Sequence, residues 1–276
     1  MSDVGVTMMP PMMTSDELAD LKSAVRLLES DSFASRLTRL LGGQVRALGR
    51  ALPGAAQKAI ALATDAALKT ALRVALRSLG STAPGKARER WHQAAAAASG
   101  AVGGAFGIAA TAVELPISTT ILIRSIAEIA RENGEDLKDP EAAFACLSVF
   151  GLGGDRPEGA DTRRSRYYAV RGELSRGLSD VDFVLVKQGI ATELAPMLTR
   201  YLSQIAARFG IVVTEKLAAQ ALPIVGAVGG AAVNAAFAQH FQALARGHFI
   251  VRRLERAHGE EAVRFEYERL RGEMKT

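Results

Sequence analysis

Apolar residues along this chain recur at intervals of three and four positions, the spacing that places them on one face of an α-helix. Thr14 and Glu17 have the spacing of a capping box, directly before such an apolar pattern. Runs that alternate apolar and polar residues are few, so strands are not expected. The pattern predicts an all-α protein, with helices over residues 14–28, 55–79, 94–131 and 139–151, a basic amphipathic helix from about 163, and helices over 182–209, 225–258 and 260–271.

Prolines and glycines divide these predicted helices. Pro116 is expected to interrupt the segment 94–131, while Gly134 and Gly259 are expected to stop the helices that precede them. Asp139-Pro140 is typical of a helix start, because proline is favoured at the first helical position. Residues 1–13 are expected to be a flexible lead to one helical domain, 14–276. Residues 153–161 are a candidate linker between two halves, 14–152 and 162–276.

One short sequence occurs twice. The six residues 100–105 are identical to residues 226–231, and a predicted helix stop follows each copy after about thirty residues. Several of these glycines are four positions apart, so they share a helix face. Each glycine costs a helix about 1 kcal/mol, a cost that close packing of a second helix would offset. We therefore predict two long glycine-rich helices at the centre of a multi-helix bundle, as a pseudo-symmetric internal duplication.

These two segments raise the question of membrane insertion. Glu114 is the only charged residue between Arg90 and Arg124, and no charge lies between Lys216 and Arg246 if His240 is neutral. Both stretches are long enough to span a bilayer. However, their alanines and glycines contribute little to insertion, and one glutamate near the centre of a span costs about 2.5–3.5 kcal/mol. Buried core helices are favoured, and a membrane-inserted hairpin is the alternative.

Composition narrows the partners and the compartment. Hydrophobic residues make up 49% of the chain but aromatics only 5%, so the core must consist largely of Ala, Leu, Val and Gly. The net charge of +5 suits an anionic surface such as a membrane. Nucleic acid is not expected, because no recognition motif is present and aromatics are scarce. Cys146, the single cysteine, lies in an apolar run and is expected to be buried. No secretory signal is apparent, which favours a cytoplasmic protein, peripheral at the inner membrane.

Three blocks of sequence resemble the signature blocks of the EcsC family. They are Glu114-Leu115-Pro116 with Thr119-Thr120 and Ile126-Ala127, then residues 223–234, then residues 245–249 with 252–255. The family takes its name from a gene beside an ABC exporter. The resemblance therefore implies an envelope or transporter context and no particular reaction.

A few polar residues in these blocks are candidates for chemistry. Glu114 is a lone carboxylate in an apolar stretch, which calls for a partner: a helix end, an arginine of another helix, or a ligand. In the repeat alignment it falls opposite His240, and a Glu–His pair can act as an acid–base couple or as metal ligands. His248 and Asn234 are supporting candidates. The chain has no HExxH motif, so we expect no metal and no cofactor, and a buried polar network is the competing interpretation.

A basic stretch closes the last long predicted helix. It contains Arg246, Arg252, Arg253 and Arg256, and it either contacts lipid headgroups or a partner protein, or forms ion pairs with nearby glutamates. The leading hypothesis is a non-enzymatic, membrane-associated or interaction protein that can form homo-oligomers. The alternative is a hydrolase or metal-dependent enzyme that uses Glu114 and His240.

Overall fold

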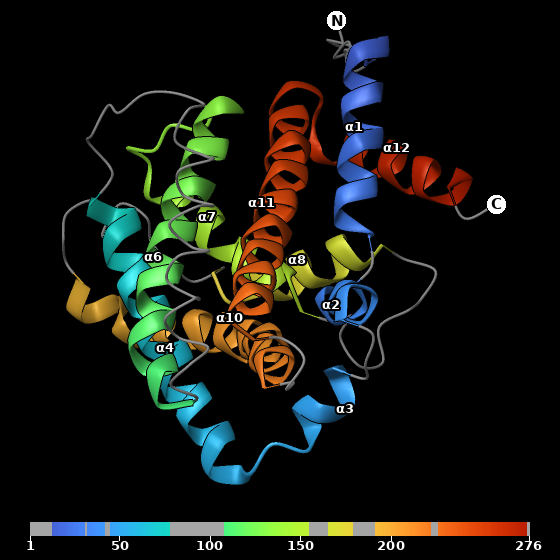
Figure 1. Cartoon of the computed structure of the whole chain (residues 1–276). Helices are drawn as coiled ribbons and strands as arrows, with labels where there is room; N and C mark the ends of the chain where they lie inside the picture. Colours follow the sequence, from blue (N-terminus) through green and yellow to red (C-terminus); the bar gives the residue numbers. More distant parts are fainter. Residues whose placement is uncertain are drawn as a thin grey trace, which may run out of the picture.

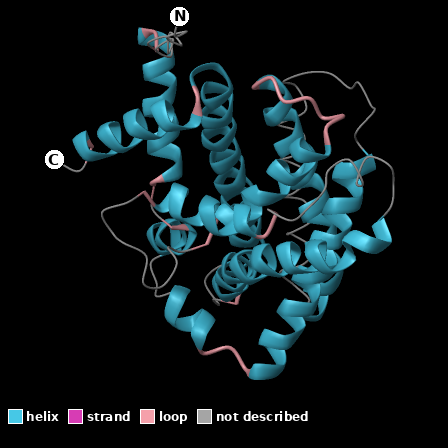
Figure 2. Cartoon of the chain, turned by 180° about the vertical axis from the view of Figure 1, so that it is seen from behind, coloured by secondary structure: helices cyan, strands magenta, loops and turns pink. Residues whose placement is uncertain are grey.

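Long crossing helices form the described part of the chain (Figure 1). The computed structural model describes residues 13–30, 32–41, 45–77, 108–154, 165–178, 191–221 and 226–274. Their helices are α1 (Ser15–Leu28), α2 (Phe33–Leu41), α3 (Val45–Arg50), α4 (Gly54–Arg77), α6 (Ile108–Glu132), α7 (Pro140–Leu152), α8 (Arg166–Arg176), α10 (Ala191–Gln220), α11 (Gly226–His258) and α12 (Glu260–Glu273). Figure 2 shows no strand among these residues, which confirms the predicted all-α bundle.

Local capping chemistry sets several helix ends where it was predicted. Thr14 caps α1 and forms both hydrogen bonds of a capping box with Glu17. Asp139 caps α7, whose first residue is Pro140. Gly134 follows α6 with φ of 78°, and Gly259 separates α11 from α12 with φ of 85°. Positive φ at these two glycines lets the chain leave each helix without a Cβ clash.

Two predicted helix ends are wrong. α6 continues through Pro116, although the ring removes one hydrogen-bond donor, because the helix packs along both α4 and α11. α10 continues through Gly210 to Gln220, since the buried Val212 and Val213 that follow the glycine still face the core. In both cases tertiary packing outweighs a local helix-breaking preference. Helices α2 and α3 were not predicted. Residues 94–107 of the predicted helix 94–131 lie outside the described residues.

α11 lies at the centre of the bundle (Figure 1). It packs against α1 on one side and α6 on the other, and α10 crosses it. Several phenylalanine rings gather at this crossing, where the ring centroids of Phe150 and Phe209 are 4.9 Å apart and those of Phe237 and Phe241 are 5.1 Å apart. Phe33 of α2 joins the same cluster. Cys146 is buried nearby in α7, as predicted, and burial raises the pKa of its thiol.

Several sequence-based predictions concern residues that the structure does not describe. Residues 1–12, the first copy of the repeat at 100–105 and most of the candidate linker 153–161 are among them. The pseudo-symmetric duplication and the two halves therefore stay predictions. Within the described ranges, no helix combines the length and the apolar character needed to cross a bilayer.

Helices α1 and α11 approach closely at Gly247. A Cβ at this position would lie 2.6 Å from Cγ of Leu28 and 3.2 Å from the carbonyl oxygen of Ala24. Leu28 is buried, so its side chain has little room to move. The glycine thus allows the two backbones to pack at a distance that no larger residue permits.

We predict that Gly247→Ala lowers the free energy of unfolding by about 1–2 kcal/mol, because the clash with α1 exceeds the gain of about 1 kcal/mol in helix propensity. Urea denaturation measures this change. Gly210→Ala is the matched control, since a Cβ there meets no atom within 4 Å, and it should stabilise the protein. Stabilisation by both substitutions would contradict the close packing at Gly247.

Candidate functional site

Glu114 of α6 forms a buried ion pair with Lys216 of α10. The Lys216 Nζ and Glu114 Oε1 atoms are 2.6 Å apart, and both side chains are more than nine-tenths buried. Asn234 of α11 donates to the same carboxylate oxygen at 3.5 Å and accepts from Gln220 at 3.3 Å. The lone carboxylate therefore has a partner on another helix, which was one of the alternatives from the sequence, but the partner is a lysine and not an arginine.

The surroundings of Lys216 are unfavourable for a charge. Burial lowers the pKa of the ammonium group, and the Glu114 carboxylate opposes this shift. The ammonium group also lies 4.9 Å from the ring centroid of Phe237, within the range of a cation–π contact. The ion pair thus connects α6 to α10. Each charge compensates the cost of burying the other.

His240 lies apart from this pair. It is six residues, or about 9 Å of helix, beyond Asn234 on α11. Its ring packs against Phe33 and Phe241, and its Nε2 atom is 3.4 Å from the carbonyl oxygen of Gly153. Burial lowers its pKa to about 3, helped by Arg36. No described bond joins His240 to Glu114, and the described residues include no group of three or more metal-ligating side chains.

His248, one turn before Arg252 on α11, is the centre of a second polar cluster. Its Nδ1 atom is 2.9 Å from the hydroxyl of Tyr167, which accepts a hydrogen bond from Arg171 Nη1 at 3.3 Å. Its Nε2 atom is 3.5 Å from the Ser148 hydroxyl. The histidine is 3% exposed, and burial holds its pKa well below the ordinary value. The ring is therefore neutral at physiological pH.

The partners of Tyr167 determine which nitrogen of His248 carries the proton. Arg171 can only donate, so the tyrosine oxygen accepts from it. Its single O–H then donates to His248 Nδ1, the only acceptor it has among the described residues. Burial raises the pKa of Tyr167 to about 12, so this proton stays in place. Nδ1 is thus the acceptor, and the neutral ring carries its proton on Nε2, facing Ser148.

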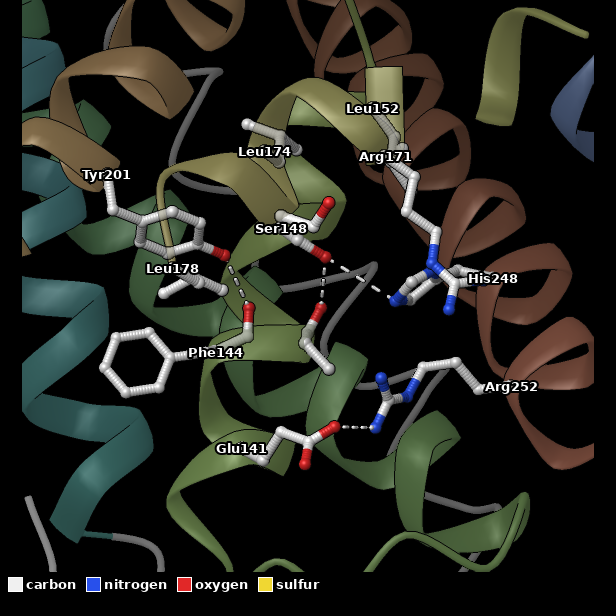
Figure 3. Close-up of a pocket in the computed structure, with 12 residues that line it drawn as sticks. Glu141, Phe144, Ser148, Leu152, Arg171, Leu174, Leu178, Tyr201, His248 and Arg252 are labelled. Carbon is white, nitrogen blue, oxygen red and sulfur yellow. Dashed lines mark hydrogen bonds and ion pairs between the residues drawn. The ribbon is translucent and has the colours of Figure 1, made fainter. Parts of the chain in front are cut away.

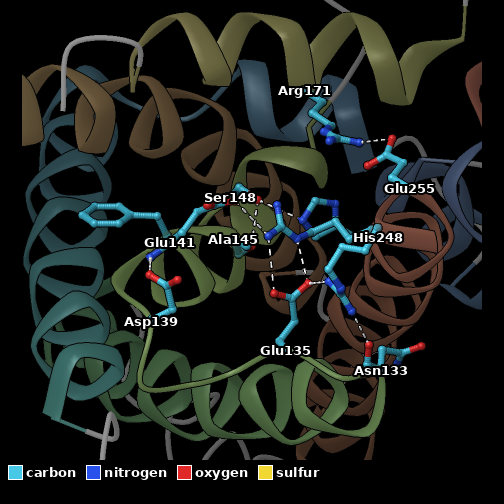
Figure 4. A network of polar contacts seen from close by, with 12 residues as sticks. Asn133, Glu135, Asp139, Glu141, Ala145, Ser148, Arg171, His248 and Glu255 are labelled. Carbon is cyan, nitrogen blue, oxygen red and sulfur yellow. Dashed lines mark hydrogen bonds and ion pairs between the residues drawn. The ribbon is translucent and has the colours of Figure 1, made fainter. Parts of the chain in front are cut away.

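The predicted basic stretch forms ion pairs within the chain (Figure 4). Arg252 binds both carboxylate oxygens of Glu135, at 2.8 and 3.3 Å, and reaches Glu141 at 3.1 Å. Arg256 also pairs with Glu135 and donates to the Asn133 carbonyl oxygen. These bonds connect α11 to the segment that follows α6. Of the two alternatives for the basic stretch, the structure thus shows ion pairs, and the glutamates that form them are distant in sequence from α11.

The remaining arginines of this stretch are also engaged. Arg253 donates to Asp20 of α1 at 2.5 Å. Arg246 is half-buried and has an interaction within the chain. Contact of this stretch with lipid or a partner stays a prediction.

A pocket of about 250 Å3 opens beside His248, and we call it the His248 pocket (Figure 3). Helices α7, α8, α10 and α11 contribute its walls. Arg171 and Arg252 line it on either side of the His248 ring, and Glu255 holds Arg171 at 2.6 Å. The residues that line it are Glu141, Phe144, Ala145, Ser148, Leu152, Arg171, Leu174, Ser175, Leu178, Tyr201, His248 and Arg252.

Comparison with known proteins identifies the family. The EcsC protein family model matches residues 17–254. The chain belongs to the EcsC family. No curated protein and no solved structure gives a significant match.

The EcsC-like blocks supply only part of each polar cluster. The first block contains Glu114, the second Asn234, and the third both His248 and Arg252. Their partners outside the blocks were not proposed as site residues from the sequence: Lys216, Ser148, Tyr167, Arg171 and Glu135. One sequence signal could have identified Lys216 as the partner of Glu114. Glu114 is the charge within the first uncharged stretch, and Lys216 is the charge at the start of the second.

We predict that Lys216→Met lowers the free energy of unfolding by about 3–5 kcal/mol, because it leaves a buried carboxylate without its cation. Adding Glu114→Gln should recover much of this loss, since an amide needs no counter-charge. A double-mutant cycle by urea denaturation measures the coupling. Additive losses would contradict a direct ion pair.

Stability should also depend on the two buried histidines. Histidine in an unfolded chain has a pKa near 6.5, and the folded value is about 3 for His240 and well below 6.5 for His248. At a pH between the folded and unfolded pKa values, the unfolded chain binds more protons than the folded chain. Stability is therefore fully present above about pH 6.5 and falls by about 1.4 kcal/mol per pH unit for each histidine as the pH drops.

Denaturation at a series of pH values from about 7.5 to about 5 measures this slope. His240→Phe keeps an aromatic ring between Phe33 and Phe241 and removes one of the titrating groups. The variant should lose the part of the slope that corresponds to one proton. An unchanged slope would mean that His240 is protonated in the folded protein.

Proposed function

We propose that this EcsC protein acts by binding and not by catalysis. The observation that carries the proposal is the hydrogen-bond chain from Arg171 through Tyr167 to His248 Nδ1, from which we infer that the proton of His248 lies on Nε2. The other acid–base candidates are also held in fixed interactions. Glu114 is paired with Lys216, and the neutral His240 lies against the Gly153 carbonyl oxygen.

Ser148 and His248 are the described pair that most nearly resembles a nucleophile and its base. A general base must accept the hydroxyl proton through Nε2, but here Nε2 already carries a hydrogen. The Ser148 hydroxyl donates instead to the Ala145 carbonyl oxygen, at 2.8 Å. The hydrogen bond at 3.5 Å therefore runs from the histidine to the serine, opposite to the direction needed for hydrolysis.

A membrane surface is the second part of the proposal. The net charge of +5 and the exporter context implied by the family resemblance support it. Three arginines of the predicted contact stretch, Arg252, Arg253 and Arg256, are paired with carboxylates. Attachment through anionic headgroups would therefore draw on exposed basic residues elsewhere, such as Arg26, Lys58 and Arg124.

Hydrolysis of p-nitrophenyl acetate tests the first part of the proposal. We expect the wild type and Ser148→Ala to give equal rates, because the serine has no base. Metal content of the purified protein is measured alongside and should not change in Glu114→Gln or His240→Gln. A rate that Ser148→Ala abolishes in a folded protein would refute binding without catalysis. Stoichiometric metal that either of the other variants loses would support the metal-dependent alternative.

Fractionation of cells that express the native protein tests the membrane part. We expect the protein in the membrane fraction and its release by high salt, because screened charges no longer hold it. Resistance to both high salt and alkaline carbonate would indicate inserted segments. Recovery entirely in the soluble fraction would contradict membrane association.

A further inference from the structure

The His248 pocket has one polar side and one apolar side (Figure 3). Arg171, His248 and Arg252 lie together on the polar side, whereas Phe144 and Tyr201 lie on the other. The Tyr201 hydroxyl donates to the Phe144 carbonyl oxygen at 2.9 Å, so this side offers mainly ring and aliphatic surface. Leu152, Leu174 and Leu178 complete the apolar lining. A ligand that fills the pocket must match this division.

The polar side is rich in hydrogen-bond donors. The buried His248 carries a hydrogen on Nε2, by the argument given above. Arg171 uses only Nη1 for Glu255 and Tyr167, so Nε and Nη2 have no acceptor among the described residues. Arg252 uses Nε and Nη2 for Glu135 and Glu141, and Nη1 likewise has no described acceptor. A guanidinium group carries five N–H bonds, so both arginines retain donors for a ligand.

Charge around the pocket sets the charge of the ligand. Arg171, Arg252 and Arg256 are balanced by Glu135, Glu141 and Glu255, as described above. A phosphate dianion would leave this neutral arrangement with a large excess of negative charge. A monoanion adds only one charge, and it can be shared between two guanidinium groups and a neutral N–H donor. A cation would face the guanidinium groups of Arg171 and Arg252, with Glu141 as the one carboxylate among the lining residues.

We propose that the His248 pocket binds a small monocarboxylic acid with an apolar body. The carboxylate accepts from His248 Nε2, in place of the 3.5 Å hydrogen bond to Ser148, and from the remaining N–H groups of Arg171 and Arg252. The body packs between the leucines and Tyr201. The pocket volume of about 250 Å3 leaves room for a small organic acid. The assignment rests on the proposed function, since it treats the acid as a bound ligand and not as a substrate.

Titration calorimetry of the full chain with octanoate tests this assignment, with octan-1-ol and octylamine as uncharged and cationic analogues. We expect octanoate to bind with a Kd below about 1 mM, and at least about tenfold more tightly than either analogue. Equal affinity for octanoate and octan-1-ol would overturn the carboxylate contact. Failure of octanoate to bind would overturn the whole assignment.

Ser175→Trp locates the binding in the pocket. Ser175 is exposed at the lining, so a tryptophan there obstructs the pocket without disturbing the core. Octanoate affinity should fall at least about tenfold, while the melting temperature stays unchanged. Arg176→Trp, at an exposed neighbour that does not line the pocket, is the matched control and should bind normally. Equal affinity in both variants would place the acid elsewhere and overturn the proposal.

The ester-hydrolysis assay distinguishes the two proposals. Absence of octanoate binding together with absence of turnover refutes only the ligand assignment. Turnover that depends on Ser148 refutes the binding function itself.

Discussion

The burial of one long helix, α11, is the constraint on which the rest of this structure depends. A buried polar group without a hydrogen bond costs about 1–3 kcal/mol, so each polar side chain of the central helix needs a partner. Those partners come from different neighbours. Asn234 contacts Glu114 of α6, His240 the Gly153 carbonyl oxygen after α7, Gln242 Ser125 of α6, and His248 Tyr167 of α8. Together with the close approach at Gly247, these bonds fix the positions of α1, α6, α7 and α8 along α11.

The same constraint decides the chemistry of the candidate site. His248 could serve as an acid, a base or a ligand in water. In this bundle, however, burial keeps it neutral and the Arg171–Tyr167 pair places its proton on Nε2. The result is a fixed donor beside two arginines and an apolar wall, which suits recognition of an acceptor better than proton transfer. A network that stabilises the fold thus also determines what the pocket can bind.

Local chemistry explains why much of the fold could be predicted. The Thr14–Glu17 capping box, the Asp139-Pro140 start and the stop at Gly259 each depend on residues close in sequence. The predicted break at Pro116 failed because the cost of one proline, about 3 kcal/mol in a helix interior, is smaller than the packing of α6 against its neighbours. The candidate pair of Glu114 and His240 relied on an alignment of repeats, and the structure gives each residue a different partner.

The sequence by itself determined the helical class, the main helix starts, membership of the EcsC family and the polar residues of α11 that require partners. These follow from periodicity, capping and motifs, all of which act over a few residues. Only the tertiary structure decided which partners meet them. Lys216 is 102 residues from Glu114, and Tyr167 is 81 residues from His248. Contacts over such separations arise from helix packing, and so do the proton position on His248 and the pocket beside it, because desolvation and hydrogen-bond direction exist only once the helices are assembled.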